Sequence, residues 1–212
     1  MKNPVLSLRI SGNPSLNTYA NYEFAMLPVA MLTLLVIYLL APELRLSLLN
    51  LRKADGPVQP SVLLGIRQEG KERWKTLGLS IGSIITLVTA AVVYFASRGK
   101  TLTGPLLPNL AWVGLFALMN AFIEEVIYRL TFATISENEK LPRQTSLLFG
   151  ALVFGLVHYF GVAPSGVLGV ILASFIGFFL TKSILETRGF YWAWLIHFLQ
   201  DLVIIGALTF WS

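Results

Sequence analysis

The chain has 212 residues, of which 55% are apolar and only 13% are charged. Soluble domains usually carry about 25% charged residues, so this composition excludes an ordinary water-soluble enzyme. An aromatic content of 12% excludes a disordered chain, and the absence of Cys excludes disulfides and thiolate chemistry. The net charge of +5 does not indicate nucleic-acid binding, because the cations lie between apolar runs.

In chain order, six apolar runs predict membrane-spanning helices at residues 24–41, 77–96, 105–135, 146–163, 165–181 and 190–211. Each run approaches or exceeds the ~20 residues that cross a bilayer, and backbone polar groups in hydrocarbon must be paired within a helix. We therefore expect an all-α, polytopic integral membrane helix bundle of about six transmembrane helices. Residues 1–212 are predicted to form a single membrane domain.

The distribution of Lys and Arg predicts the orientation. Loop 42–76 has seven of these cations, and loops 136–145 and 182–189 have two each, so one side carries eleven against four on the other. Cytoplasmic loops carry the excess of cations. The large loop is thus expected in the cytoplasm and both termini outside.

Two further patterns concern packing and the membrane surface. Small residues recur at helical spacing in 78–82 and 169–177, which favours close helix packing. In the large loop, residues 63–74 mix aliphatic side chains with cations. This segment fits either a short helix on the lipid surface or a solvated loop.

Ionisable side chains inside spans are costly and indicate function by default. The predicted spans hold six of them: Glu124, Glu125, Arg129, His158, His197 and Asp201. Residues four apart share a helix face, so Glu125 can pair with Arg129. Glu124 lies about 100° round the helix from its neighbour and is left as the spare carboxylate for proton transfer.

The other helices supply matching groups. His197 and Asp201 are four apart and project together, and Phe154 stands one turn before His158, where it can wall a pocket. At 1.5 Å per residue, Glu124, His158, His197 and Asp201 lie roughly 17, 18, 11 and 17 Å from the cytoplasmic ends of their predicted helices. This agreement in depth predicts one shared site near the middle of the membrane.

Such a site fits hydrolysis by an activated water. Glu124 can act as the base and His158 can position the water. His197 can face the oxyanion, with Asp201 orienting its ring or donating a hydrogen bond when protonated. The same residues are acceptable zinc ligands, so zinc or another divalent metal stays open, as does a metal-free reaction. A transporter or proton relay also uses buried Glu, His and Asp.

Three motifs occur in order on the late helices: Glu124-Glu125-x-x-x-Arg129, Phe154-x-x-x-His158 and His197-x-x-x-Asp201. Together they resemble the CPBP family of intramembrane proteases, which includes CAAX-processing endopeptidases and bacterial relatives linked to bacteriocin processing or self-immunity. The resemblance covers residues 111–205, the expected catalytic core.

The resemblance implies an intramembrane endopeptidase that cleaves a membrane-associated protein or peptide, in a bacterial inner or plasma membrane. It implies that Glu124 and His158 activate water and that His197 and position 201 form the oxyanion pocket. Glu125 and Arg129 would support them. Position 201 is usually Asn in that family and is Asp here, and Leu130 replaces the usual Gly. A non-catalytic membrane partner of the self-immunity type is the remaining alternative.

Overall fold

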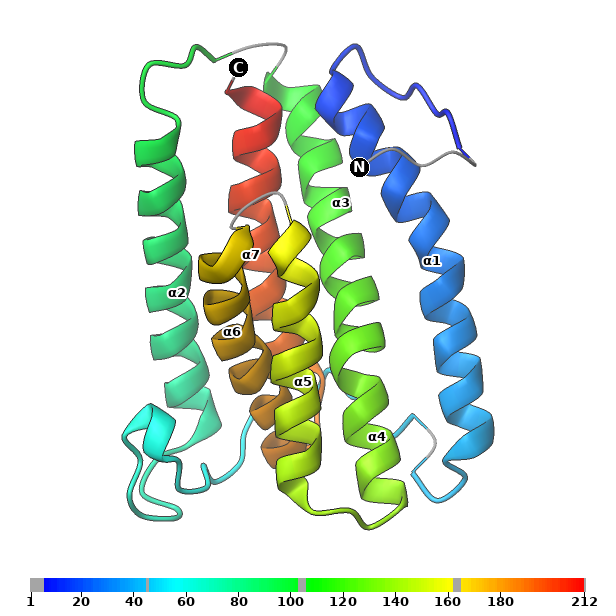
Figure 1. Ribbon diagram of the computed structural model, residues 1–212, viewed down its shortest axis with the longest axis vertical. Coiled ribbons are helices and arrows are strands. Elements are labelled where there is room, and N and C mark those ends of the chain that lie inside the picture. The colour runs from blue at the N-terminus through cyan, green and yellow to red at the C-terminus, as the bar shows by residue number, and fades with distance from the viewer. Residues whose placement is uncertain (1–5, 45, 103–105, 162–164, 212) are drawn as a thin grey trace.

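The computed structural model describes residues 6–44, 46–102, 106–161 and 165–211. Its helices run side by side along the long axis of the molecule (Figure 1). They are α1 (Pro14–Leu40), η1 (Val62–Leu64), α2 (Trp74–Ala96), α3 (Leu106–Glu125), η2 (Val126–Leu130), α4 (Thr131–Asn138), α5 (Arg143–Val157), η3 (His158–Phe160), α6 (Gly166–Thr187) and α7 (Tyr191–Phe210). Figure 1 shows α1 beginning and α7 ending at the same end of the bundle.

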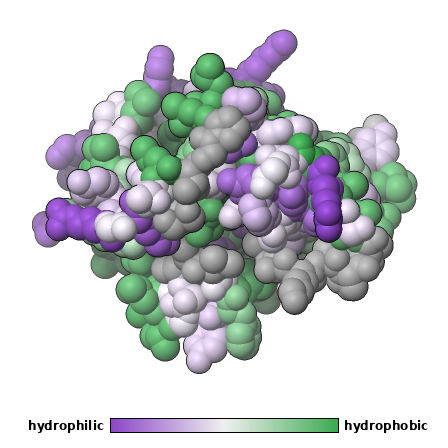
Figure 2. Space-filling model, turned by 90° about the horizontal axis from the view of Figure 1, so that it is seen from above, coloured by the Kyte–Doolittle hydropathy of each residue, from purple (hydrophilic) through white to green (hydrophobic). Residues whose placement is uncertain are grey.

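Five helical segments are long and apolar enough to cross a membrane: α1, α2, the continuous segment Leu106–Asn138, α6 and α7. Large aliphatic side chains on the outer faces of these helices are exposed, as Leu32, Leu87 and Leu168 show. Viewed from the end where α1 begins, hydrophilic residues gather on the end face with hydrophobic residues between them and along the rim (Figure 2). The chain is an all-α, multi-pass integral membrane protein, as its composition predicts.

The fourth span was predicted as one continuous helix over residues 146–163, and the structure shows a shorter α-helix in its place. The α-helix α5 has 15 residues and ends at Val157, and His158–Phe160 follow as a 3₁₀ turn. A helix of this length is about 22 Å long, and α5 ends below the level that α2, α3 and α7 reach (Figure 1). The predicted span ends at residues 105 and 163 lie outside the described residues.

The first helix begins earlier than predicted. Asn13 is its N-cap, with the side-chain Oδ1 accepting hydrogen bonds from the backbone N–H groups of Ser15 and Leu16 at 2.9 and 3.3 Å. Pro14 occupies the first turn, where its missing N–H costs nothing. These signals extend α1 ten residues upstream of the predicted start at residue 24.

Small residues bring the helices together as the sequence predicts. Gly169, Ala173 and Gly177 are buried on α6, and a Cβ at Gly177 would collide with the backbone of Gly150 on α5. On α2, a Cβ at Gly78 would enter the ring of Trp192 on α7. Close backbone approach therefore holds α5 on α6 and α2 on α7.

Glu186 on α6 joins several segments at the end of the bundle that holds the 41–73 segment. Its carboxylate lies 2.7 Å from Nη2 of Arg143, accepts a hydrogen bond from Nε1 of Trp74 at 2.7 Å, and pairs with Lys182. The backbone N–H of Gln59 also donates to it at 3.2 Å. Lys182, counted in the sequence as a loop cation, is thus a buried residue of α6, which continues past the predicted end at 181 to Thr187.

The orientation across the membrane stays a prediction and can be tested with single cysteines, because the chain has none of its own. A Ser212→Cys variant should react with a membrane-impermeant maleimide in intact cells, although position 212 lies outside the described residues. Glu139→Cys, in the connection between α4 and α5, should react only after lysis. The reverse pattern would invert the predicted topology.

Candidate active site

One cavity of about 500 Å³ lies among the helices and is lined by residues of α1, α2, α3, η2, α5, η3, α6 and α7. Glu124, His158, His197 and Asp201 all line it, together with Phe154. The structure therefore brings together four ionisable groups from three segments that are far apart in sequence. Glu125 and Arg129 stand behind this wall and are fully buried.

The imidazole of His197 is the centre of the polar cluster. Its Nδ1 lies 2.7 Å from Oε1 of Glu125, and its Nε2 lies 3.5 Å from Oε2 of Glu124 and 3.6 Å from Oδ2 of Asp201. A carboxylate can only accept, so Nδ1 carries a proton. The ring is thus fixed by Glu125, and Nε2 is directed at the two carboxyl groups of the cavity wall.

Asp201 lies on the other side of the His197 ring, 3.6 Å from Nε2, so its expected role of orienting the ring or donating a hydrogen bond stays a prediction. Glu125 occupies Nδ1, and Asp201 is held from another helix. The Nδ2 of Asn120 on α3 donates a hydrogen bond to Oδ2 of Asp201 at 3.0 Å. Asp201 therefore has a fixed position beside Nε2 of His197.

Glu125 also binds Arg129, its predicted partner one turn along the chain. Nη1 of Arg129 lies 2.8 Å from Oε1 of Glu125, and both side chains are fully buried. The guanidinium carbon lies 3.5 Å from the ring centroid of Phe154, a cation–π contact that helps to place the charge in an apolar surrounding. The chain makes a π-helical turn at Val126–Leu130, a widening often found at functional sites.

His158 is positioned by the end of α5. Its Nδ1 lies 2.9 Å from the backbone carbonyl oxygen of Phe154, and the two rings pack with centroids 4.3 Å apart. A carbonyl oxygen can only accept, so Nδ1 donates, and Nε2 of the neutral ring remains an acceptor. Because α5 ends here, His158 lies where a helix terminates at the cavity rather than in the middle of a span.

The sequence reading missed several polar residues of the cavity. Asn120 lies one turn before Glu124 on the same helix face, and this four-residue spacing could have identified it as a residue of the site. The side chain of Gln200 accepts from Thr89 at 2.5 Å and donates to Thr86 at 2.8 Å, which joins α7 to α2. Tyr19 and Tyr22 line the cavity from α1, in a part of the chain that the motifs do not cover.

A further carboxyl group lies in the interface that α1 makes with its neighbours. Glu23 is fully buried, and neither of its oxygens has a hydrogen-bond partner within the described ranges. The predicted first span began one residue later, at 24, and so left Glu23 outside. Extending the helix back to its N-cap at Asn13 would have placed this residue inside the membrane segment.

Glu23→Met is expected to raise the midpoint of thermal unfolding in detergent. Burying a polar group without a partner costs about 1–3 kcal/mol in proteins, and Met fills a similar volume without that cost. Glu43→Met, at an exposed loop position, is the matched control and should leave the midpoint unchanged. A lower midpoint for Glu23→Met would mean that the carboxyl has a stabilising partner.

The sequence left open a divalent metal ion bound by these side chains, and the arrangement of the side chains can be checked for such a site. Among the residues that the structure describes, no three His, Asp or Glu side chains are arranged to hold one ion. Catalytic zinc usually has three protein ligands. The described side chains do not fit such a centre.

Comparison with known proteins places this site in a family. Residues 105–203 match the family described as type II CAAX prenyl endopeptidase Rce1-like. No curated protein and no solved structure matches the chain. The matched region contains all three motifs with their carboxylates and histidines, and its members are membrane proteases. Residues 105–203, a little under half of the chain, are therefore similar to the Rce1-like type II CAAX prenyl endopeptidases.

Proposed function

We propose that this membrane protease hydrolyses a peptide bond of a membrane-associated protein or peptide, using a water molecule activated by Glu124 and His158. The observation that carries the proposal is that Glu124, His158, His197 and Asp201 line a single cavity. Hydrolysis needs a base, a group that positions water and donors for the oxyanion. The four side chains include candidates for each role.

In the proposed reaction, the Glu124 carboxylate takes a proton from water while Nε2 of His158 accepts the second water hydrogen in a hydrogen bond. The oxygen attacks the carbonyl carbon and gives a tetrahedral oxyanion. His197 donates to that oxyanion through Nε2 when its ring carries both protons. Glu124 then returns its proton to the leaving amine as the C–N bond breaks.

The remaining wall of the cavity suits a substrate that arrives from the membrane. Ile84 and Val88 of α2 face it from one side, and Leu172 and Ile176 of α6 from another. These aliphatic side chains offer apolar contact to a chain segment or a lipid-like group. We therefore propose a membrane-anchored substrate, in agreement with the family match.

Comparative analysis of newly formed peptide termini tests the proposal. Membranes containing the wild type should yield at least one cleavage product that is absent with Glu124→Ala. Glu139→Ala, which removes an exposed carboxylate that does not line the cavity, should give the wild-type product. Identical termini for wild type and Glu124→Ala would contradict proteolysis by this site.

Asp201→Asn is expected to keep activity within about tenfold of the wild type, if position 201 donates to the oxyanion. The amide oxygen can accept from Asn120, as Oδ2 of Asp201 does at 3.0 Å, and the amide nitrogen is a permanent donor. Wild-type activity should fall as rising pH ionises Asp201, whereas the Asn variant should not follow it. Rate profiles against pH for both proteins provide the measurement.

Asp201→Leu is the contrasting variant, because it leaves the amide of Asn120 without its acceptor and supplies no donor. It should be inactive at every pH. An inactive Asp201→Asn variant would instead assign Asp201 an anionic role. Inhibition of the wild type by a chelator would point to a metal reaction and contradict the proposed metal-free reaction.

A further inference from the structure

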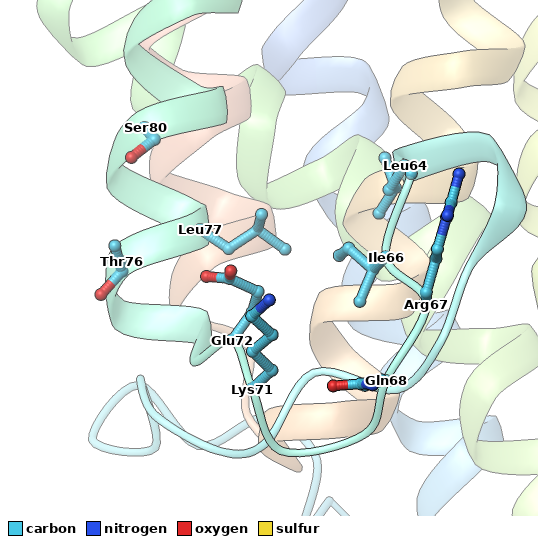
Figure 3. A pocket seen from close by; sticks show the side chains of 10 residues that line it. Leu64, Ile66, Arg67, Gln68, Lys71, Glu72, Thr76, Leu77 and Ser80 are labelled. Carbon is cyan, nitrogen blue, oxygen red and sulfur yellow. The ribbon is translucent and has the colours of Figure 1, made fainter.

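A second cavity, of about 520 Å³, lies at the foot of α2, away from the catalytic residues. One wall is the segment that leads into α2, and the other is the first turns of the helix itself. Figure 3 shows Ile66 and Leu77 pointing toward each other from the two walls, Gln68 at the lower edge, Lys71 rising beside Glu72, and Arg67 pointing along the hairpin away from Lys71. The wall of the cavity therefore combines aliphatic and charged side chains.

Of the two forms expected for residues 63–74, a short helix on the lipid surface or a solvated loop, the structure shows a loop, which is folded as a hairpin. Isolated β-bridges pair Pro57 with Arg73 and Ser61 with Ile66. An ion pair of 2.8 Å between Arg73 and Asp55 fixes its base. The cavity is thus held open by the fold of the loop, and its cations are placed by backbone pairing.

Two cations line this cavity without an ion pair. Arg67 and Lys71 are exposed, and within the described ranges no ion pair includes either of them. The one carboxylate in the wall, Glu72, offsets only one of the two charges. Arg and Lys beside side-chain amides and hydroxyls make a donor set that matches phosphate oxygens. Gln68, Thr76 and Ser80 supply those neutral donors.

The surroundings of the cavity are apolar and exposed. Val62, at the tip of the hairpin, is 100% exposed, Leu63 is 60% exposed, and Leu79 on the adjoining helix is 57% exposed. The hairpin lies beside the first turns of α2, which is a candidate span (Figure 1). A rim of cations next to exposed aliphatic side chains is typical of the boundary between headgroups and acyl chains.

We infer that this cavity binds an anionic phospholipid of the leaflet that faces the 41–73 segment. Its phosphate binds at the rim, where the exposed side chains of Arg67 and Lys71 turn toward it, and its acyl chains follow Val62 and Leu79. A free phosphate offers the same oxygens but has nothing to place against the apolar tip. The lipid explains both the unpaired cations and the exposed aliphatic side chains.

The test is lipid retention measured by native mass spectrometry of protein released from nanodiscs that contain equal amounts of phosphatidylglycerol and phosphatidylcholine. The wild type should retain phosphatidylglycerol preferentially. Each cation near an anionic lipid contributes about a fivefold preference, so Arg67→Gln/Lys71→Gln should lower it by about thirtyfold. Arg52→Gln/Lys53→Gln removes the same charge from the same loop, outside the cavity, and should change little.

Two further arms identify the source of the phosphate. Val62→Ser/Leu63→Ser keeps both cations and should also weaken retention, because it removes the apolar contact. Millimolar inorganic phosphate should not displace the lipid. Any one of three results would overturn the inference. Phosphate could displace the lipid, the Arg67→Gln/Lys71→Gln variant could retain as much phosphatidylglycerol as the wild type, or the wild type could retain both lipids equally. None of these readouts depends on proteolysis, so the result is independent of the proposed function.

Discussion

Glu124→Gln is expected to lower the rate of peptide-bond hydrolysis by about 10²–10⁴-fold, the usual contribution of a general base. The amide keeps the shape of the side chain but cannot take a proton from water. Glu124 faces the cavity with 16% of its side chain exposed, and its nearest charged contact is Nε2 of His197 at 3.5 Å. The substitution should therefore leave the fold intact.

Activity and folded yield have to be measured together on purified protein in lipid. The expected pattern is loss of activity with a wild-type elution profile and unfolding midpoint. Glu139→Gln is the control for removal of a carboxylate that is not in the site. A Glu124→Gln variant with wild-type activity would assign the base to another residue.

Glu125→Gln, one position along, is expected to act mainly on stability. Removing one partner of a buried ion pair costs about 3–5 kcal/mol, because the other charge is left without compensation. The full cost is expected for Arg129, because its side chain is fully buried. Its nearest carboxylate oxygen is Oε1 of Glu125 at 2.8 Å. The unfolding midpoint and the yield of folded protein should both fall.

A matched pair on the surface gives the comparison. Glu137 lies 2.8 Å from Arg188, with the two side chains 24% and 47% exposed, and exposed pairs contribute about 0–1 kcal/mol. Glu137→Gln should accordingly have a small effect. A Glu125→Gln variant as stable as Glu137→Gln would mean that Arg129 finds another partner.

The double variant Glu125→Met/Arg129→Met separates stability from catalysis. Replacing both members of a buried pair by apolar residues is often neutral or stabilising, so the folded yield should recover relative to Glu125→Gln. Activity should not recover, because the hydrogen-bond partner of Nδ1 of His197 is still missing. Recovery of both would show that His197 does not need Glu125 for its orientation.

Local spacing explains why much of the polar cluster was predictable from the sequence. The pairing of Glu125 with Arg129 follows from a separation of four residues on one helix, and the structure gives it at 2.8 Å. The contact of Glu125 with His197 joins residues 72 positions apart. Nothing in the spacing of a single helix reports such a contact, because it depends on how α3 and α7 face each other.

Helix ends were predicted less well than helix positions, for a physical reason. Hydropathy measures whether a segment tolerates lipid, and it does not measure where the backbone hydrogen bonds stop. His158, Tyr159 and Phe160 continue an apolar run, so the end of α5 was missed, although Gly161 follows directly. At α6 the run of apolar residues stops before the helix does, because Lys182 and Glu186 pair one turn apart and extend it.

The ionic junction at Glu186 has a mechanical consequence. It ties the foot of α2, through Trp74, to α6 and to the start of α5 at Arg143. Farther along, α2 and α6 are separated by the catalytic cavity, which both of them line. Relative motion of α2 and α6 is therefore expected to be a rotation about the end where Glu186 joins them. Such a motion displaces the two helices least at the Glu186 junction and most beside the residues that line the catalytic cavity.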